Sequence, residues 1–218
     1  MVNRTQHRTH QHCAPGNPPQ RPQTPQRRFL LRPPGQRCIS RGGDGKSAGC
    51  CCHTNTANRQ QQLAKRYKFI GKIYHASGDY SRAMIYSNQA IEICEQFGNK
   101  QSLMNLYNDL GIVYSDMGNY NKTLEFYQKS LNLAEELNDL KGMAKSLNNI
   151  GIVYYESGNN EKALEFYQKS LKIEEELKNR EGLGSSYNNI GIIYSDWNQN
   201  NLAIDYYKRA LEIMEEYI

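Results

Sequence analysis

A 40-residue internal repeat constrains the fold of this chain more than any other feature of its sequence. The stretch LEFYQKSL at residues 124–131 recurs at residues 164–171, and the blocks around the two copies agree at 19 of 40 positions. The four blocks in this register are residues 61–100, 101–140, 141–180 and 181–218, of which the last is two residues short. Self-similarity at a fixed period of this length indicates a solenoid, in which one supersecondary unit stacks on the next.

Each block carries two helical patterns separated by a turn signal. In the third block, Leu147, Ile150 and Tyr154 recur at helical spacing, and a second apolar stripe runs from Ala163 to Leu177. A glycine between the two stripes suits the left-handed conformation that ends a helix. The residues at this turn position are Gly78, Gly118, Gly158 and Asn198. No block shows the strict alternation of a half-buried strand, so we predict an all-α protein of stacked helical hairpins.

Glycine also recurs inside the first helix of every block, at Gly71, Gly111, Gly151 and Gly191. In a helix interior glycine costs about 0.5 to 1 kcal/mol relative to alanine. Its return at each period therefore indicates that a second helix approaches closely there. Tyrosines three residues later, such as Tyr154, are expected to fill the space beside the glycine.

These features resemble those of tetratricopeptide repeat proteins. The resemblance rests on a Leu/Ile-Gly-x-x-Tyr core at residues 110–114, 150–154 and 190–194, on the turn glycine, and on small residues in the second helix. The usual period of that family is 34 residues, and the longer spacing here is more similar to kinesin light chains and to repeat segments of bacterial sensor kinases and regulators. The resemblance implies a right-handed α-solenoid of four helix-turn-helix repeats over residues 61–218, whose first helices line a concave groove that binds peptide segments.

Residues 1–60 have a different composition from the repeats. They hold all seven prolines and a formal charge of +9, whereas the repeats carry −4. Their only apolar cluster is Phe29, Leu30 and Leu31. Such a segment cannot bury enough apolar surface to offset the entropy of ordering its backbone. We therefore expect a disordered tail over residues 1–60, followed by the repeat domain.

The sequence offers little for catalysis or metal binding. His75 is the only histidine and Cys94 the only cysteine of the repeats, so no nucleophile, base and stabiliser can be placed together. The His- and Cys-rich stretches at residues 7–13 and 50–53 lack the paired ligand spacing of a structural zinc site. We expect no enzymatic activity, no cofactor and no metal. No stretch has the length of a signal peptide core or a membrane span, so we expect a cytoplasmic protein without a membrane partner.

The resemblance places the binding groove on the first helix of each repeat. Amides dominate two and three residues before each glycine, and an amide both donates and accepts hydrogen bonds, which suits the backbone of an extended peptide. Isoleucines follow the glycines, and carboxylates lie one turn later, so the partner peptide is expected to carry apolar and basic residues. A purely structural role for the amides stays open, since neighbouring positions on a helix cannot point in one direction. The candidate groove residues are Asn108, Asp109, Asn148, Asn149, Asn188, Asn189, Ile112, Ile152, Ile192, Asp116, Glu156 and Asp196.

The function that these patterns favour is a protein-interaction scaffold that binds a peptide segment of a protein partner. A sensory or regulatory segment of a larger signalling system is one alternative. A nucleic-acid tether through the basic tail is another, and it is the weaker one because the tail offers only Phe29 for base stacking. The last helix ends in Leu211, Met214 and Tyr217 without a polar capping helix, so we also expect apolar exposure and self-association there.

Overall fold

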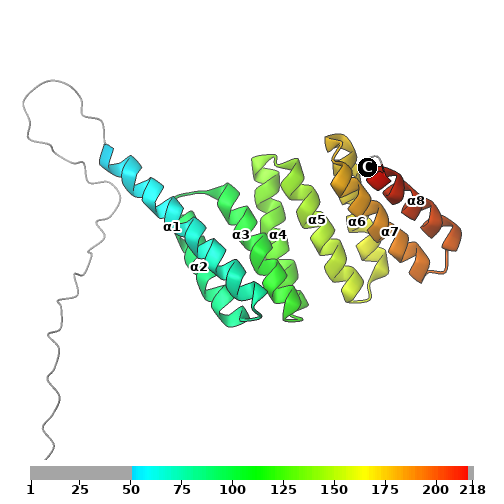
Figure 1. Cartoon of the computed structure of the whole chain (residues 1–218), viewed down its shortest axis with the longest axis horizontal. Helices are drawn as coiled ribbons and strands as arrows, with labels where there is room; N and C mark the ends of the chain where they lie inside the picture. Colours follow the sequence, from blue (N-terminus) through cyan, green and yellow to red (C-terminus); the bar gives the residue numbers. More distant parts are fainter. Residues whose placement is uncertain (1–50, 216–218) are drawn as a thin grey trace, which may run out of the picture. The chain divides into compact units, whose positions relative to one another are not determined.

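The computed structural model describes residues 51–215, and all of them fall in one compact unit, Ser47–Ile218. Across these residues the chain forms eight α-helices and no strand (Figure 1). The helices are α1 (Cys51–Ala76), α2 (Tyr80–Gln96), α3 (Lys100–Asp116), α4 (Tyr120–Leu137), α5 (Leu140–Glu156), α6 (Asn160–Leu177), α7 (Arg180–Asp196) and α8 (Asn200–Glu215). Helix α1 thus includes residues 51–60, which the sequence analysis assigned to the tail. The disorder predicted for residues 1–50 lies outside the described residues.

Turn chemistry in the sequence explains where the helices end and begin. Gly118, Gly158 and Asn198 adopt positive φ angles of 71°, 80° and 57°, as predicted for the turn between the two helices of a repeat. After Gly118 and Gly158, the next residue caps the following helix. Asn159, for example, accepts a hydrogen bond from the backbone N–H of Lys162, which otherwise has no partner in the first turn of α6.

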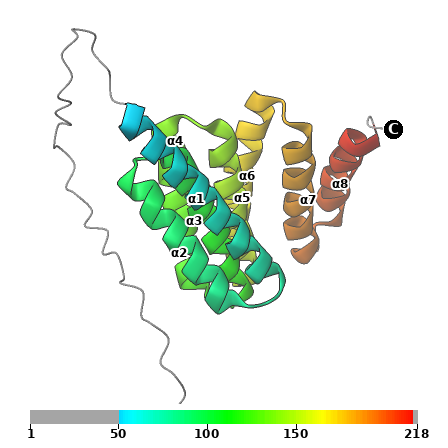
Figure 2. The ribbon, with the colours of Figure 1, turned by 60° about the vertical axis from the view of Figure 1, so that its left-hand side comes forward.

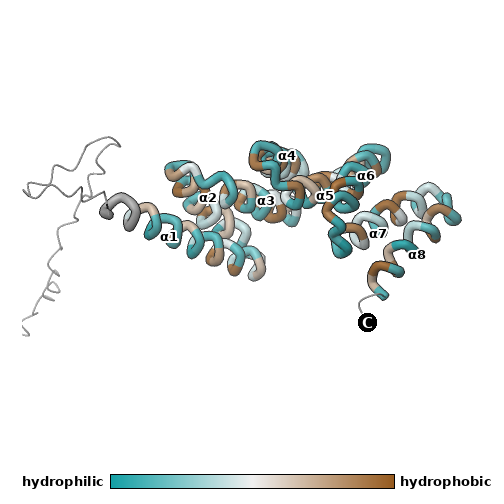
Figure 3. Tube along the Cα trace, turned by 90° about the horizontal axis from the view of Figure 1, so that it is seen from above, coloured by the Kyte–Doolittle hydropathy of each residue, from teal (hydrophilic) through white to brown (hydrophobic). Residues whose placement is uncertain are grey.

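The helices stack in chain order, each packed against the next (Figure 2). Every helix carries both hydrophilic and hydrophobic residues along its length (Figure 3), so each has an apolar stripe to bury against its neighbours. The first helices of successive repeats, α1 with α3 and α3 with α5, also contact each other more extensively than the second helices do. We call the surface formed by α1, α3, α5 and α7 the inner face.

The close helix approach predicted from the recurring glycines is confirmed. A Cβ atom on Gly151 would lie only 2.6 Å from ring atoms of Tyr167 in α6, and that tyrosine is buried. The prediction that Tyr154 fills this space is wrong. Its ring lies about one turn further along α5, where it stacks on Phe166 of α6 with a centroid separation of 5.4 Å.

Small residues of the second helices are buried against the first helices. The hydroxyl of Ser130 in α4 donates to the backbone oxygen of Met104 in α3, and that of Ser170 donates to the backbone oxygen of Ala144, at 3.0 Å and 2.9 Å. Each bond pairs a carbonyl and a hydroxyl that are both buried, so the small side chains join the two helices of a repeat by hydrogen bonding as well as by close packing.

The last helix exposes apolar side chains, and no described helix is a candidate membrane span. Leu211 and Met214 of α8 are 52% and 66% exposed, as predicted, whereas Tyr217 lies outside the described residues. None of the helices within residues 51–215 is long and apolar enough to cross a membrane.

Candidate functional site

A ladder of side-chain contacts joins the first helices along the inner face. Its amide contacts each link a residue to the one 41 positions later, on the first helix of the next repeat. The Nδ2 atom of Asn149 donates to Oδ1 of Asn108 over 2.8 Å, and Nδ2 of Asn189 donates to Oδ1 of Asn148 over 2.9 Å. Four of the candidate amides are therefore bonded in two pairs, one between α3 and α5 and the other between α5 and α7.

The amides of this ladder differ in how accessible they are. Asn108 is 3% exposed, and its Nδ2 atom is buried without a hydrogen-bond partner among the described residues. Asn148, Asn149 and Asn189 are partly buried. Asn188, on the first helix of the last repeat, is exposed, and its side chain makes no hydrogen bond within the described part of the chain. Of the candidate amides, Asn188 is therefore the most open to a ligand.

Between α1 and α3, ion pairs take the place of the amide hydrogen bonds. Lys68 and Lys72 of α1 each place Nζ 3.3 Å from a carboxylate oxygen of Asp109 on α3, at Oδ2 and Oδ1 respectively. Oδ2 is buried and accepts no hydrogen bond of good geometry from any described residue, so its contact with Lys68 is an ion pair by distance only. The candidate set contained Asp109 but neither lysine. Aligning the first helices at an offset of 41 instead of 40 residues would have paired Lys68 with Asp109.

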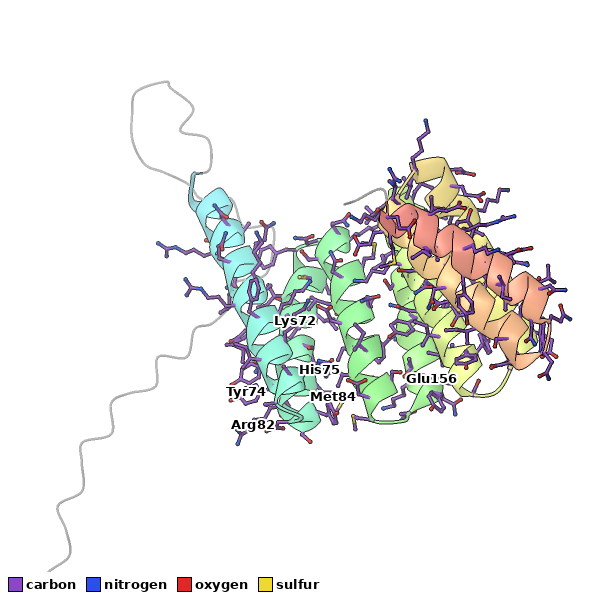
Figure 4. The ribbon with its side chains drawn as sticks, turned by 45° about the vertical axis from the view of Figure 1, so that its right-hand side comes forward. Lys72, Tyr74, His75, Arg82, Met84 and Glu156 are labelled. Carbon is purple, nitrogen blue, oxygen red and sulfur yellow. The ribbon has the colours of Figure 1, made fainter. Side chains whose placement is uncertain are left out.

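Two of the three candidate carboxylates at the acidic edge are engaged with the preceding first helix. Oδ2 of Asp116 lies 2.6 Å from Nε2 of His75. Asp196 of α7 accepts a hydrogen bond from the phenol of Tyr155 on α5. Burial, together with the charge and hydrogen bond of Asp196, raises the pKa of this phenol. Glu156 (Figure 4) is exposed and makes no ion pair or hydrogen bond through its side chain within residues 51–215. Glu156 is thus the carboxylate best placed to meet a basic group on a ligand.

The candidate isoleucines form a partly buried apolar stripe beside this ladder. Ile112 packs against the core cluster that contains Tyr127 and Leu147, and Ile152 packs against the cluster that contains Tyr167 and Ile190. Ile192 occupies the same position on α7 and is also partly buried. These side chains leave part of their apolar surface accessible between the amides and the carboxylates.

The groups with catalytic or metal-binding chemistry are scattered. Within the described residues no three His, Cys, Asp or Glu side chains come together in a way that could hold a metal ion. Burial raises the pKa of the Cys94 thiol, which makes this thiol a poor nucleophile. The inner face is therefore suited to contact through shape, hydrogen bonding and charge.

Comparison with known families agrees with this architecture. A family model described as Tetratricopeptide repeat matches residues 102–176 and 142–216, and a second model of the same description matches residues 64–97. No curated protein sequence matches the chain.

Solved structures share the fold. BtubC (BKLC) from P. vanneervenii superposes with a TM-score of 0.65 at 18% identity, over 76% of this chain and 71% of BtubC. Aspartyl phosphate phosphatase F from Bacillus subtilis gives a TM-score of 0.70 at 19% identity, over 72% of this chain and 42% of that protein. A Rap protein complexed with Competence and Sporulation Factor gives 0.64 at 18% identity, over 74% and 44%. This chain spans less than half the length of the last two proteins. With family models matching more than half of its residues, in the register of its own four helix pairs, the chain belongs to the tetratricopeptide repeat family.

Proposed function

We propose that this protein is a non-enzymatic scaffold that binds a peptide segment of a partner protein on its inner face. The observation that carries the proposal is the position of Ile112, Ile152 and Ile192, three partly exposed apolar side chains on successive first helices. Glu156, whose side chain makes no ion pair or hydrogen bond in the described structure, lies one turn further along α5. A surface with apolar and acidic groups in this order favours a peptide with apolar and basic side chains.

The structure gives most of the candidate amides a role in joining the repeats, and the proposed contact with a peptide backbone is kept for Asn188. Because the amide groups of Asn108, Asn149 and Asn189 are used in joining the repeats, they contribute to a rigid wall. Asn188 keeps its donor and acceptor for a ligand and suits a peptide backbone. The Rap protein solved with Competence and Sporulation Factor has the same fold and supports a binding role for such a stack.

Peptides selected from a random phage-displayed library on the immobilised full chain test this proposal. We expect enrichment of peptides that combine apolar residues with lysine or arginine. Glu156→Lys should weaken such a peptide about tenfold or more, because it replaces an attractive contact by a repulsive one. Asn188→Ala should weaken it up to about tenfold through the loss of one hydrogen bond.

A matched control uses the opposite side of the stack. Glu176 is an exposed glutamate on α6, so Glu176→Lys makes the same charge change away from the inner face. Selected peptides should bind this variant as they bind the parent chain. Peptides that lose affinity on Glu176→Lys but tolerate Glu156→Lys would assign binding to the second helices and refute the proposal.

Self-association through the last repeat remains a separate prediction. Leu211 and Met214 expose apolar surface on α8 and provide the contact that a second copy could cover. Sedimentation of the full chain should show a mass that rises with concentration, and Leu211→Glu should reduce that rise. A monomer at all concentrations would show that this surface does not bind another copy.

A further inference from the structure

The first repeat lacks the tyrosine that covers the helix glycine in the other three. Tyr127, Tyr167 and Tyr207 of the second helices lie against Gly111, Gly151 and Gly191. The corresponding residue of the first repeat is Ser87 on α2. Ser87 is buried, and its hydroxyl lies 3.0 Å from the point where a Cβ on Gly71 would stand. The serine therefore keeps the close helix approach but does not supply the ring.

A pocket of 170 Å³ occupies this place between α1, α2 and α3 on the inner face. Gly71, Ser87, Ile112 and Val113 line it, together with the polar residues Lys68, Lys72, His75 and Asp109. A cavity of about 150 Å³ can accommodate benzene. The space left by the replacement of tyrosine with serine is therefore large enough for one aromatic ring.

One buried polar atom of the pocket lacks a hydrogen bond of good geometry. Oδ2 of Asp109 is buried and accepts no hydrogen bond from the described residues, although Lys68 lies 3.3 Å away. A buried carboxylate oxygen without a hydrogen bond is costly, and a hydroxyl from a ligand would satisfy it.

We propose that this pocket receives the side chain of a tyrosine from the partner peptide. The ring lies over Gly71 and Ser87 against Val113, and the phenol hydroxyl donates to Asp109, which lines the same pocket. This inference deepens the proposed peptide-binding function and rests on it for the source of the tyrosine. The pocket itself can be tested without any peptide.

The test uses p-cresol, which is the side chain of tyrosine without its backbone, titrated into the full chain and followed by NMR. We expect saturable shifts of the methyl signals of Ile112 and Val113, because a bound ring shifts the methyl groups beside it. Ser87→Tyr should abolish these shifts, since it fills the pocket with the ring that the other repeats already carry. Toluene should bind about tenfold more weakly than p-cresol, because it cannot donate to Asp109. Asp109→Asn should reduce that preference.

A reciprocal variant covers the case in which Ser87→Tyr does not fold. Tyr127→Ser should open a second pocket over Gly111 and raise the number of bound p-cresol molecules from one to two. The inference is overturned if p-cresol gives no saturable shift at Ile112 or Val113, or if folded Ser87→Tyr binds it as the parent chain does. Retained p-cresol binding with no peptide selected on the inner face would instead contradict the proposed function and leave the pocket assignment intact.

Discussion

Asn149 and Asn108 share a 2.8 Å hydrogen bond between two repeats, at a point where Asn108 is almost fully buried. The stability of a solenoid is approximately a sum of repeat terms and neighbour terms, and this bond belongs to the neighbour term between α3 and α5. Asn108 and Asn149, which the sequence analysis predicted to bind a ligand, thus stabilise the contact between the helices that form the proposed binding surface.

Asn149→Ala is therefore expected to destabilise the chain. The substitution leaves the amide of Asn108 buried with neither its oxygen nor its nitrogen bonded, which costs about 1 to 3 kcal/mol. Urea unfolding followed by circular dichroism measures the loss. Asn188→Ala is the matched control, because the Asn188 amide is exposed, and its effect should stay within about 0.5 kcal/mol. Equal effects of the two changes would show that the ladder contributes nothing to stability.

Glycine-to-alanine changes on two first helices should have opposite signs. A Cβ on Gly151 would lie 2.6 Å from the buried ring of Tyr167, and overpacking of this kind costs about 1 to 3 kcal/mol. Around Gly184 of α7 the nearest atom, in Ile213, would be 3.9 Å away. Gly184→Ala should therefore stabilise the chain by about 0.5 to 1 kcal/mol through helix propensity alone. Thermal melts of the two variants give the comparison, and a stabilising Gly151→Ala would mean that α5 and α6 have room to separate.

Lys178 ends α6 in the left-handed conformation, with a φ of 51°. A side chain with a Cβ is strained there, so Lys178→Gly is expected to raise the free energy of unfolding by about 1 kcal/mol. The same substitution at Lys172, inside α6, should lower it by about 1 kcal/mol. Chemical unfolding of both variants against the parent chain checks the prediction. If Lys178→Gly were as damaging as Lys172→Gly, the strain at this turn would be negligible.

Two buried tyrosines should make the fold sensitive to alkaline pH. Burial, with nearby carboxylates in support, raises the pKa of Tyr127 above its ordinary 10.0, and burial does the same for Tyr167. A raised folded-state pKa means that the folded chain holds the proton more tightly than the unfolded chain. The stabilisation is complete below pH 10 and is lost as the pH rises above it.

Phenylalanine substitutions isolate this effect. The double variant Tyr127→Phe, Tyr167→Phe should keep its helical signal to higher pH than the parent chain between about pH 10 and 12. Tyr120→Phe changes a tyrosine that is exposed on the surface and should leave the alkaline transition where it was. An unchanged transition in the double variant would assign alkaline unfolding to other groups.

The sequence by itself determined the local structure of the repeats. The helical spacing of Leu147, Ile150 and Tyr154, the turn residues Gly158 and Asn198, and the recurring glycines predicted helix pairs with a close contact in each, and the structure contains them. These signals were readable because each depends on residues a few positions apart in one helix or turn.

The tertiary structure decided what those helices present to one another and to a ligand. Only the structure shows that Tyr167 and not Tyr154 covers Gly151, that Asn108 faces Asn149, and that Ser87 opens a pocket. Contacts between repeats depend on how far one helix is shifted along its neighbour, which makes the contact offset 41 residues in a chain whose repeat is 40. That shift follows from the packing of side chains across two helices, and the pattern within either helix does not encode it.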